Sequence, residues 1–480
     1  MAPCAPASLP QVFGRRHQLA VLACACVLAT LVYGYSRSAR SVIEVPDLLG
    51  TERRIDIRLP PDYYDRPVGD FYQPLIDRFF EPWNCLAPAA SNTSLCRRPV
   101  TTAALSALEW IAKDNAYRIR YTGKDILYRP LQKFSANHKV SRMRWIMHMI
   151  REMADKGLLH QDADGTSVPV RFDAIFWGAD GPRITRDTLG PDAGYFLFAL
   201  RTSRLHLDVP IPDPVAYGSN GNYVWPPRSE LHTWDEKVDK LIFRGTAAYP
   251  FGVDNWQTNC RIRAVQLGQA YPHLIDAGIT QYRPKAMPPV TSDDFVKHEA
   301  FFRVPSTTRI QELSNLTEAS KVTFLERSGY KYILDVNGAL GSSRRLGLLK
   351  SGSVPFFIDS PWFGTFMPLL RPWVHYVPVD ESLTDLPAKI EWLRQHDDHA
   401  RFIVRNAIAF ADAYLTQNSA MEVFSMLLKR YTQLLAPDVK LDSSNVSMNY
   451  CDTAVGREAL QTGPMGCSTG WKVFRGEVET

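Results

Sequence analysis

The sequence of 480 residues lacks the features that mark several common classes of protein. Its formal net charge is only +5 and no block of Lys or Arg stands out, so charge does not indicate a nucleic-acid partner. Its eight cysteines include no CxxC pair, which excludes a zinc-ribbon site. There is no GxxxxGK[ST] motif and no GxGxxG motif, so a P-loop and a dinucleotide fold are both disfavoured. Internal repeats are also absent.

What remains is an ordinary globular composition with one unusual end. The length suffices for two domains with good cores, and 11 Trp and 23 Phe favour a folded, ligand-handling protein. The 18 residues Gln18–Tyr35 carry no charge, and arginines flank them on both sides. A cleaved signal peptide is the rival interpretation, but Tyr33–Tyr35 is not a small-residue cleavage site. We expect a cytoplasmic tail over 1–17 and an uncleaved transmembrane signal anchor over 18–35.

Sequons and cysteines indicate that the part after this anchor lies in a lumen. Three N-x-[ST] sequons begin at Asn92, Asn315 and Asn445. Two pairs of cysteines are close enough in sequence for local disulfides, although reduced packing residues would show the same spacing: Cys85 with Cys96, and Cys451 with Cys467. Cys260 would then be free and buried. The sequence therefore predicts a single-pass type II protein of the Golgi or endoplasmic reticulum membrane.

An anion site is predicted within Tyr330–Tyr376. The β-branched run Tyr332–Val336 reads as a buried parallel strand, and a glycine-containing turn, hydroxyls and arginines follow it before a short helix at Leu346–Leu349. Backbone N–H groups, a helix N-terminus and Arg side chains together suit a phosphate. A turn in which glycine serves packing alone explains the same pattern.

A second strand end repeats this chemistry. The strand Lys240–Phe243 is followed by Arg244, Gly245 and Thr246, and a helix-like run beginning at Arg261 comes next. Two strand-end arginine sites in one half of the chain suggest one shared anionic ligand, such as a diphosphate. Surface arginines that pair with nearby Asp or Glu are the alternative.

Two groups of carboxylates are candidates for chemistry. Asp162 and Asp164 form a DxD, which can hold a divalent cation, but their context HQDADGTS reads as a turn. Asp180 follows the strand Phe172–Trp177, where the ligand crevice of an open α/β sheet lies, and it could act as a general base. A plain Asp-Gly-Pro turn is the other interpretation. No metal site is expected, and the contiguous His396–His399 reads as a solvated helical face.

Four segments resemble glycosyltransferase family 90, which includes the protein O-glucosyltransferases and the capsule-associated β-1,2-xylosyltransferases. They are KLIFRGT, YKYILDVNGALGSSRRLGLLKSGSVPFF, PLLRPWVHYVPVDESLTDL and IEWLRQHDDHARFIVRNAIAFA. The resemblance is good over about 240–435 and weak over 165–240. It implies an α/β fold of the GT-B type, in which two Rossmann-like domains face a cleft, with no metal requirement.

Prolines break any long helix over 36–100, so this range reads as a stem. After it, the resemblance implies an N-terminal, acceptor-side Rossmann-like domain over 101–235. A nucleotide-sugar-binding Rossmann-like domain spans 236–437, and a tail spans 438–480.

The family's motif positions, matched residue by residue to this chain, imply which residues bind the donor and which acts as the base. The donor-binding positions fall on Arg244, Gly245, Thr246, Arg261, Ala339, Leu340, Gly341, Ser342, Ser343 and Arg344. An insertion over Tyr249–Asn259 makes Arg263 an alternative to Arg261, and the family's catalytic Asp matches Asp180. Asn337 replaces the Arg of the O-glucosyltransferases, which leaves the sugar open.

The expected activity is transfer of xylose or glucose from a UDP-sugar to a hydroxyl of a protein or glycan, with inversion and no metal cofactor. Two other classes stay open. One is a sugar-binding membrane protein without catalysis. The other is a metal-dependent GT-A transferase that uses Asp162 and Asp164.

Overall fold

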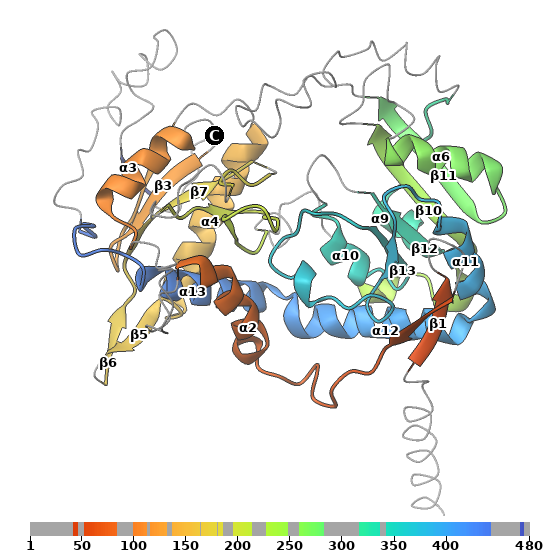
Figure 1. Cartoon of the computed structure of the whole chain (residues 1–480), viewed down its shortest axis with the longest axis horizontal. Coiled ribbons are helices and arrows are strands. Elements are labelled where there is room, and N and C mark those ends of the chain that lie inside the picture. The colour runs from red at the N-terminus through yellow and green to blue at the C-terminus, as the bar shows by residue number, and fades with distance from the viewer. Residues whose placement is uncertain are drawn as a thin grey trace, which may run out of the picture.

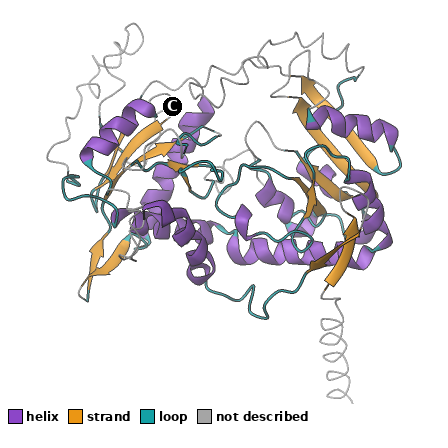
Figure 2. Ribbon diagram, viewed as in Figure 1, coloured by secondary structure: helices purple, strands orange, loops and turns teal. Residues whose placement is uncertain are grey.

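The structure is a computed structural model, and it describes part of the chain. The described residues are 42–46, 52–83, 99–112, 116–131, 137–163, 165–179, 181–185, 195–213, 227–247, 259–282, 316–336, 342–442 and 471–474. They form two α/β halves, each built on its own sheet (Figures 1 and 2). We call residues 99–213 the N-terminal half and residues 227–414 the C-terminal half.

The C-terminal half contains a five-stranded sheet in the order β11-β10-β12-β13-β14, and every neighbouring pair is parallel. The predicted α/β class with buried parallel strands is therefore confirmed. The chain enters at β10, adds β11 on one side and then crosses to β12 on the other, so the strand order reverses between β10 and β12. Open α/β sheets bind ligands beyond the carboxyl ends of their strands at such a reversal. The strands are β10 (Val238–Ala247), β11 (Ile275–Tyr282), β12 (Tyr330–Asp335), β13 (Val354–Ile358) and β14 (Val377–Val379).

Helices cover this sheet and bury both of its faces. Side chains alternate along β10 and β12, so that Ile242 and Ile333 belong to one buried cluster while Leu241 and Tyr332 belong to another. The helices of this half are α6 (Cys260–Ala270), α9 (Phe324–Ser328), α10 (Arg345–Leu349), α11 (Leu386–Gln395) and α12 (Asp397–Tyr414), with the 3-10 turns η2 (Arg228–Glu230), η3 (Trp234–Glu236) and η6 (Met367–Leu369).

The N-terminal half departs from a parallel Rossmann-like sheet. Its six strands run in the order β15-β4-β3-β7-β8-β9, and only β7, β8 and β9 are parallel to one another. Only residues 122–125 connect β3 to β4, which is too short for a crossover and forces a hairpin. The strands are β3 (Ala116–Tyr121), β4 (Ile126–Pro130), β7 (Phe172–Trp177), β8 (Phe198–Ala199), β9 (Val209–Pro210) and β15 (Lys472–Val473), and the helices are α3 (Thr102–Ile111) and α4 (Asn137–Asp155).

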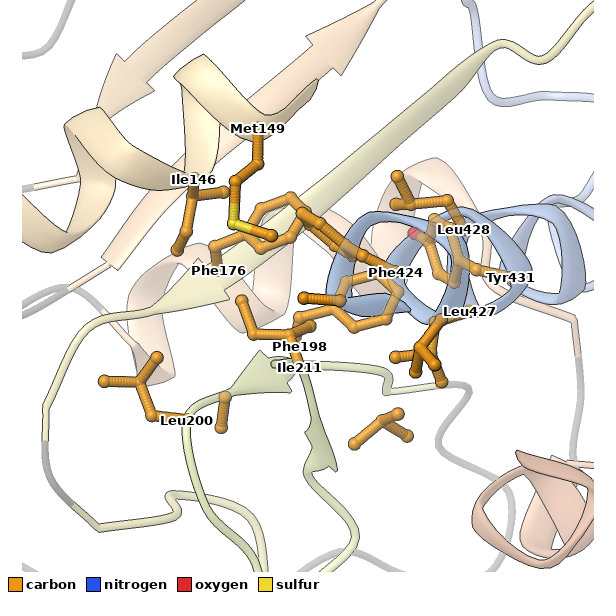
Figure 3. Close-up of a cluster of buried hydrophobic side chains, with 14 of the residues drawn as sticks. Ile146, Met149, Phe176, Phe198, Leu200, Ile211, Phe424, Leu427, Leu428 and Tyr431 are labelled. Atoms are coloured by element: carbon orange, nitrogen blue, oxygen red, sulfur yellow. The ribbon is translucent and has the colours of Figure 1, made fainter. Parts of the chain in front are cut away.

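The long C-terminal helices join the two halves. α12 lies along the C-terminal half, whereas the next helix, α13 (Gln417–Thr432), packs in the core of the N-terminal half (Figure 1). Phe424 of α13 lies edge-on to Phe176 of β7 with 6.2 Å between ring centroids (Figure 3). Tyr431 donates its hydroxyl hydrogen to the carbonyl of Asp173 at 2.7 Å. The N-terminal core therefore includes a helix that follows the C-terminal half in sequence.

Residues in the range expected to be a stem are packed onto both halves. β1 (Val42–Pro46) and β2 (Glu52–Asp56) form a hairpin whose Ile43 and Val45 are buried with the C-terminal half. α2 (Val68–Phe80), followed by η1 (Glu81–Trp83), packs on α13, and its Phe71 stacks on Tyr414 at the end of α12 with 3.7 Å between ring centroids. The remaining hairpin consists of β5 (His160–Ala163) and β6 (Thr166–Pro169).

Several predictions fall outside the described residues. These are the anchor over 18–35, the sequons at Asn92, Asn315 and Asn445, and the disulfide candidates Cys85, Cys96, Cys451 and Cys467. Within the described residues, no helix is both long enough and apolar enough to cross a membrane. Cys260 is free and half-buried, and its thiol donates to the Glu381 carbonyl at 3.3 Å.

Candidate functional site: an arginine cluster at the strand reversal

The buried carboxylate of Asp335, at the carboxyl end of β12, organises the site. Its Oδ1 accepts from the Ser342 hydroxyl at 2.9 Å and pairs with Arg344 Nη2 at 3.2 Å. Its Oδ2 accepts from Arg345 Nε at 3.1 Å. The side chain is fully buried, so these three partners replace its lost hydration. One carboxylate thus fixes the second half of the predicted donor loop, of which Ala339, Leu340 and Gly341 lie outside the described residues.

The two consecutive arginines have different environments. Arg345 is buried, and its Nη2 also donates to the Ile358 carbonyl at 3.1 Å, so it ties β12 to β13. The Arg344 side chain is 24% exposed. Its Nη2 lies 3.4 Å from the Val336 carbonyl oxygen, which is a long hydrogen bond. Arg345 is therefore a scaffold residue, whereas Arg344 retains donors that can turn to a ligand.

Arg261 connects the ends of β10 and β12 from the start of α6. Its Nη1 donates to the Thr246 carbonyl at 2.5 Å and its Nη2 to the Val336 carbonyl at 3.4 Å. The Asn259 side chain caps α6 by accepting from the backbone N–H of Arg261 at 3.0 Å. The structure thus brings Arg261, rather than Arg263, to this edge of the sheet. Gly245 leaves room for the Phe243 ring, because a Cβ there would lie 2.9 Å from it.

Arg244 belongs to the same strand end, but its guanidinium lies over β11. Its Nη2 pairs with Asp276 Oδ1 at 2.7 Å, and Tyr330 donates to Asp276 Oδ2 at 2.7 Å. Gly278 leaves room for this arrangement, since a Cβ there would lie 3.2 Å from Arg244 Cδ. Arg244 is therefore held by a carboxylate in this structure, and its role as a donor ligand stays a prediction.

Arg327, which the sequence analysis missed, adds a further cation. It lies on α9, and its Nη2 donates to the Arg244 carbonyl at 3.3 Å, while its buried Nε has no hydrogen-bond partner in the part of the chain that the structure describes. Burial, and then the positive charge of Arg344, lower the pKa of Arg327 to about 10. In the sequence, Arg327 is simply an arginine shortly before the predicted strand. The prediction sought ligand-binding residues after strands and therefore passed over it.

The cluster carries more positive than negative charge. Burial followed by the charge of Arg344 also lowers the pKa of Arg261 to about 10, and Asp335 only partly offsets this effect. Among the described residues, the electrostatic neighbours of Arg261 and Arg327 include Arg344 but only one buried carboxylate, Asp335. Like charges this close are stabilised by a bound anion. A phosphate or diphosphate at the strand reversal fits this requirement.

A pocket between the two halves adjoins this cluster. The N-terminal half lines it with Leu200, Arg201, Ile211 and Asp213, and the C-terminal half with Ser342, Ser343, Arg345 and the aromatic segment 362–367. Backbone hydrogen bonds also connect the two halves here, because Thr202 and Phe363 exchange two N–H···O bonds of 2.9 and 3.0 Å. The pocket therefore receives side chains from both sheets.

Asp180 itself lies outside the described residues, but the residues around it are firmly held. Trp177 Nε1 donates to the Gly181 carbonyl at 2.6 Å. The carboxylate of Asp208 accepts from the backbone N–H groups of Arg183 and Ile184, both at 2.8 Å. Burial raises the pKa of Asp208 to about 7, in opposition to these bonds. These bonds anchor the described residues on both sides of the predicted base.

The DxD lies elsewhere. Asp162 is exposed on the β5–β6 hairpin, which projects far from the C-terminal sheet in Figure 1, and Asp164 is outside the described residues. Within the described part of the chain, no group of three His, Cys, Asp or Glu side chains could hold a metal ion.

The expectation of a solvated helical face at His396–His399 was wrong for His399, whereas Asp398 is exposed. His399 is buried, and its Nε2 lies 3.0 Å from the Trp373 carbonyl. Burial lowers its pKa to about 4. The start of α12 turns this residue toward α11, where Trp392 lies edge-on to its ring at 5.5 Å between centroids.

Known proteins resemble this chain over the same region. The sequence profile described as "Glycosyl transferase family 90" matches residues 180–462. Protein O-glucosyltransferase 2 of Danio rerio is 28% identical over 201 residues, which are 42% of this chain and 34% of that protein. An O-glucosyltransferase rumi homolog of Aedes aegypti is 29% identical over 217 residues, which are 45% of this chain and 46% of that protein. The chain thus spans less than half the length of these curated relatives.

Solved structures give a weaker likeness. The pneumococcal O-GlcNAc transferase GtfA, in complex with UDP and GlcNAc, is 14% identical with a TM-score of 0.25 over 42% of this chain and 38% of its own. A TM-score this low carries no argument about the fold. The sequence match covers more than half of the chain, and it includes Asp180, the arginine cluster and the pocket residues. The chain belongs to glycosyl transferase family 90.

Proposed function

We propose that this protein transfers a sugar, xylose or glucose, from a UDP-sugar to a hydroxyl group of a protein or glycan acceptor. The observation that carries the proposal is the group of arginines Arg261, Arg327 and Arg344 around one buried carboxylate at the strand reversal. A nucleoside diphosphate supplies the negative charge that this group lacks. Membership of the family supports the same reaction class.

The two halves are proposed to form a GT-B type arrangement. Residues that follow β8 and β9 line one pocket together with Ser342 and Ser343, which follow β12. An acceptor held by the N-terminal half would then meet a donor held by the C-terminal half. The mixed N-terminal sheet is a variation on the Rossmann-like domain expected there.

In the proposed mechanism, Asp180 removes the proton from the acceptor hydroxyl. The oxygen attacks the anomeric carbon of an α-linked sugar from the side opposite UDP, the bond from that carbon to the diphosphate oxygen breaks, and a β-linkage forms. Arg344 and Arg261 stabilise the charge that develops on the departing UDP, with Arg244 as a further predicted ligand. Because guanidinium groups fill this role, no metal ion is required in the proposal.

The test is a donor screen with the full-length protein, which measures UDP release and product formation from UDP-xylose, UDP-glucose and other UDP-sugars. We expect one pentose or hexose donor to dominate, with activity retained in EDTA. Loss of activity in EDTA that Mn²⁺ restores would contradict metal independence and favour a GT-A type enzyme using Asp162 and Asp164. UDP binding without turnover of any donor would favour a non-catalytic sugar-binding protein.

The membrane placement stays part of the proposal. The uncharged run Gln18–Tyr35 and the three sequons support a type II protein whose catalytic part lies in the lumen of the Golgi or endoplasmic reticulum. An endoglycosidase-induced shift in mobility, absent when Asn92, Asn315 and Asn445 are all changed to Gln, would support this placement. An unglycosylated chain in a secretory host would contradict it.

A further inference from the structure

Three polar residues join the two halves directly beside the arginine cluster. Arg201 and Asp213 follow the parallel neighbours β8 and β9, so both lie at the same edge of the N-terminal sheet. Arg201 Nη2 donates to the Ser343 hydroxyl at 2.8 Å, and the Ser343 hydroxyl donates to Asp213 Oδ2. Arg201 Nη2 also lies 3.6 Å from Asp213 Oδ2. We call Arg201, Asp213 and Ser343 the interhalf triad.

The triad is buried at some cost. The side chains of Arg201 and Asp213 are only 8% and 14% exposed. Arg201 Nη1 is buried and has no hydrogen-bond partner among the described residues. A buried guanidinium nitrogen without a partner is unfavourable, so this arginine does not hold its place by optimal bonding alone.

Ser343 lies in sequence between Ser342 and Arg344, two of the predicted donor-binding residues. Ser342 is bound to Asp335 on one side of Ser343, and Arg344 is paired with the same carboxylate on the other. The short segment is therefore held from below by Asp335 of the C-terminal half and from across the pocket by Arg201 and Asp213 of the N-terminal half. Arg344 can present its free donors in one direction only while both attachments persist.

We propose that Arg201 and Asp213 are positioning residues for the nucleoside diphosphate: through Ser343 they fix the segment that carries Arg344. This inference rests on the proposed function. It makes donor affinity depend on two residues of the opposite half, neither of which lies in a donor-binding motif. Binding of the diphosphate and contact between the halves are then linked, because each stabilises the same segment.

The experiment measures UDP affinity by titration calorimetry for the full-length protein and for Ser343→Ala, Asp213→Asn and the double variant. Loss of a hydrogen bond to a charged group predicts UDP binding about tenfold weaker in each single variant. We expect the double variant to be little weaker than either single one, because both remove the same link. Arg201→Lys, which keeps the charge but loses the fork, should weaken binding similarly. Ser382→Ala, which removes a hydroxyl bonded to Thr384, is the matched control.

The outcomes separate the two proposals. If the unaltered protein binds no UDP, the proposed function fails. If it binds UDP and the folded Ser343→Ala and Asp213→Asn variants bind equally well, the triad has no positioning role. Independent effects that multiply in the double variant would also overturn the inference. Thermal unfolding of every variant shows whether it is folded, and the mild Ser343→Ala change keeps the test usable if Arg201→Lys fails to fold.

Discussion

Neighbouring arginines at the strand reversal differ in role: one holds the fold together, and the other can contact a ligand. Arg345 and Arg344 are adjacent in sequence and share the carboxylate of Asp335, yet only Arg344 is partly exposed. The sequence alone does not distinguish them, because both follow two serines at the same strand end. Burial decides which guanidinium holds the sheet together and which can reach a phosphate.

At this scale we predict that Arg344→Ala weakens UDP binding by about 1.5–3 kcal/mol, roughly tenfold to a hundredfold, because a charge-assisted contact is lost. Calorimetric titration with UDP measures it. Arg394→Ala is the control, since this arginine pairs with Asp239 on the surface. Equal affinities for the Arg344→Ala variant and the unaltered protein would remove Arg344 from the donor site.

Among the elements, the short helix α9 has a function that its length does not suggest. It has five residues, and a capping box fixes its start: Glu326 N–H donates to Thr323 Oγ1 at 3.1 Å, and Thr323 N–H donates to Glu326 Oε2 at 2.5 Å. The helix carries Arg327 toward the Arg244 carbonyl. A helix this short depends on its cap, because it makes few internal hydrogen bonds.

We therefore predict that Thr323→Ala lowers the free energy of unfolding by about 1 kcal/mol, the usual cost of a lost N-cap. UDP affinity should fall as well, because Arg327 is then less firmly held. Thr323→Ser keeps the hydroxyl and is the control. Urea denaturation measures the first effect, and an unchanged midpoint in the Ala variant would contradict it.

At the scale of the whole molecule, buried polar links join segments that are distant in sequence. His375 is fully buried and lies between the N-terminal segment and α12. Its Nδ1 accepts from the Arg371 N–H at 2.9 Å, so its Nε2 carries the proton and donates to the Tyr64 hydroxyl at 3.1 Å. Tyr64 in turn donates to Asn406 Oδ1 at 2.7 Å. This chain of bonds requires a neutral imidazole.

Burial, with a smaller effect from the charge of Arg371, lowers the pKa of His375 to about 3 from the usual 6.5. The unfolded chain therefore binds one more proton between these values, and stability is lost as pH falls through that window. We predict an extra loss of at most about 1.4 kcal/mol per pH unit from this residue. His375→Asn should be less stable at neutral pH but should flatten the dependence of the thermal midpoint between pH 6.5 and 3. An unchanged slope would assign the acid sensitivity to other groups such as His399.

Local patterns in the sequence were enough to predict two strands of the C-terminal half and the family. The largely apolar runs at Lys240–Phe243 and Tyr332–Val336 predicted strands, and the structure has β10 and β12 there. The polar residues after them indicated an anion site, because the ends of parallel strands meet at one edge. The motif segments also carried the family, which the profile match confirms.

The tertiary structure decided the features that depend on contacts between residues distant in sequence. No local pattern encodes the contacts that form the mixed N-terminal sheet or pack α13 on β7. The same is true of the contact between Arg327 and the Arg244 carbonyl. The same holds for Arg201 and Asp213, which look like ordinary loop residues until folding places them against Ser343. The sequence by itself determined the strands, the arginines near their ends and the family. Folding decided which arginines are buried and which remain available, because burial and pairing are properties of the packed molecule.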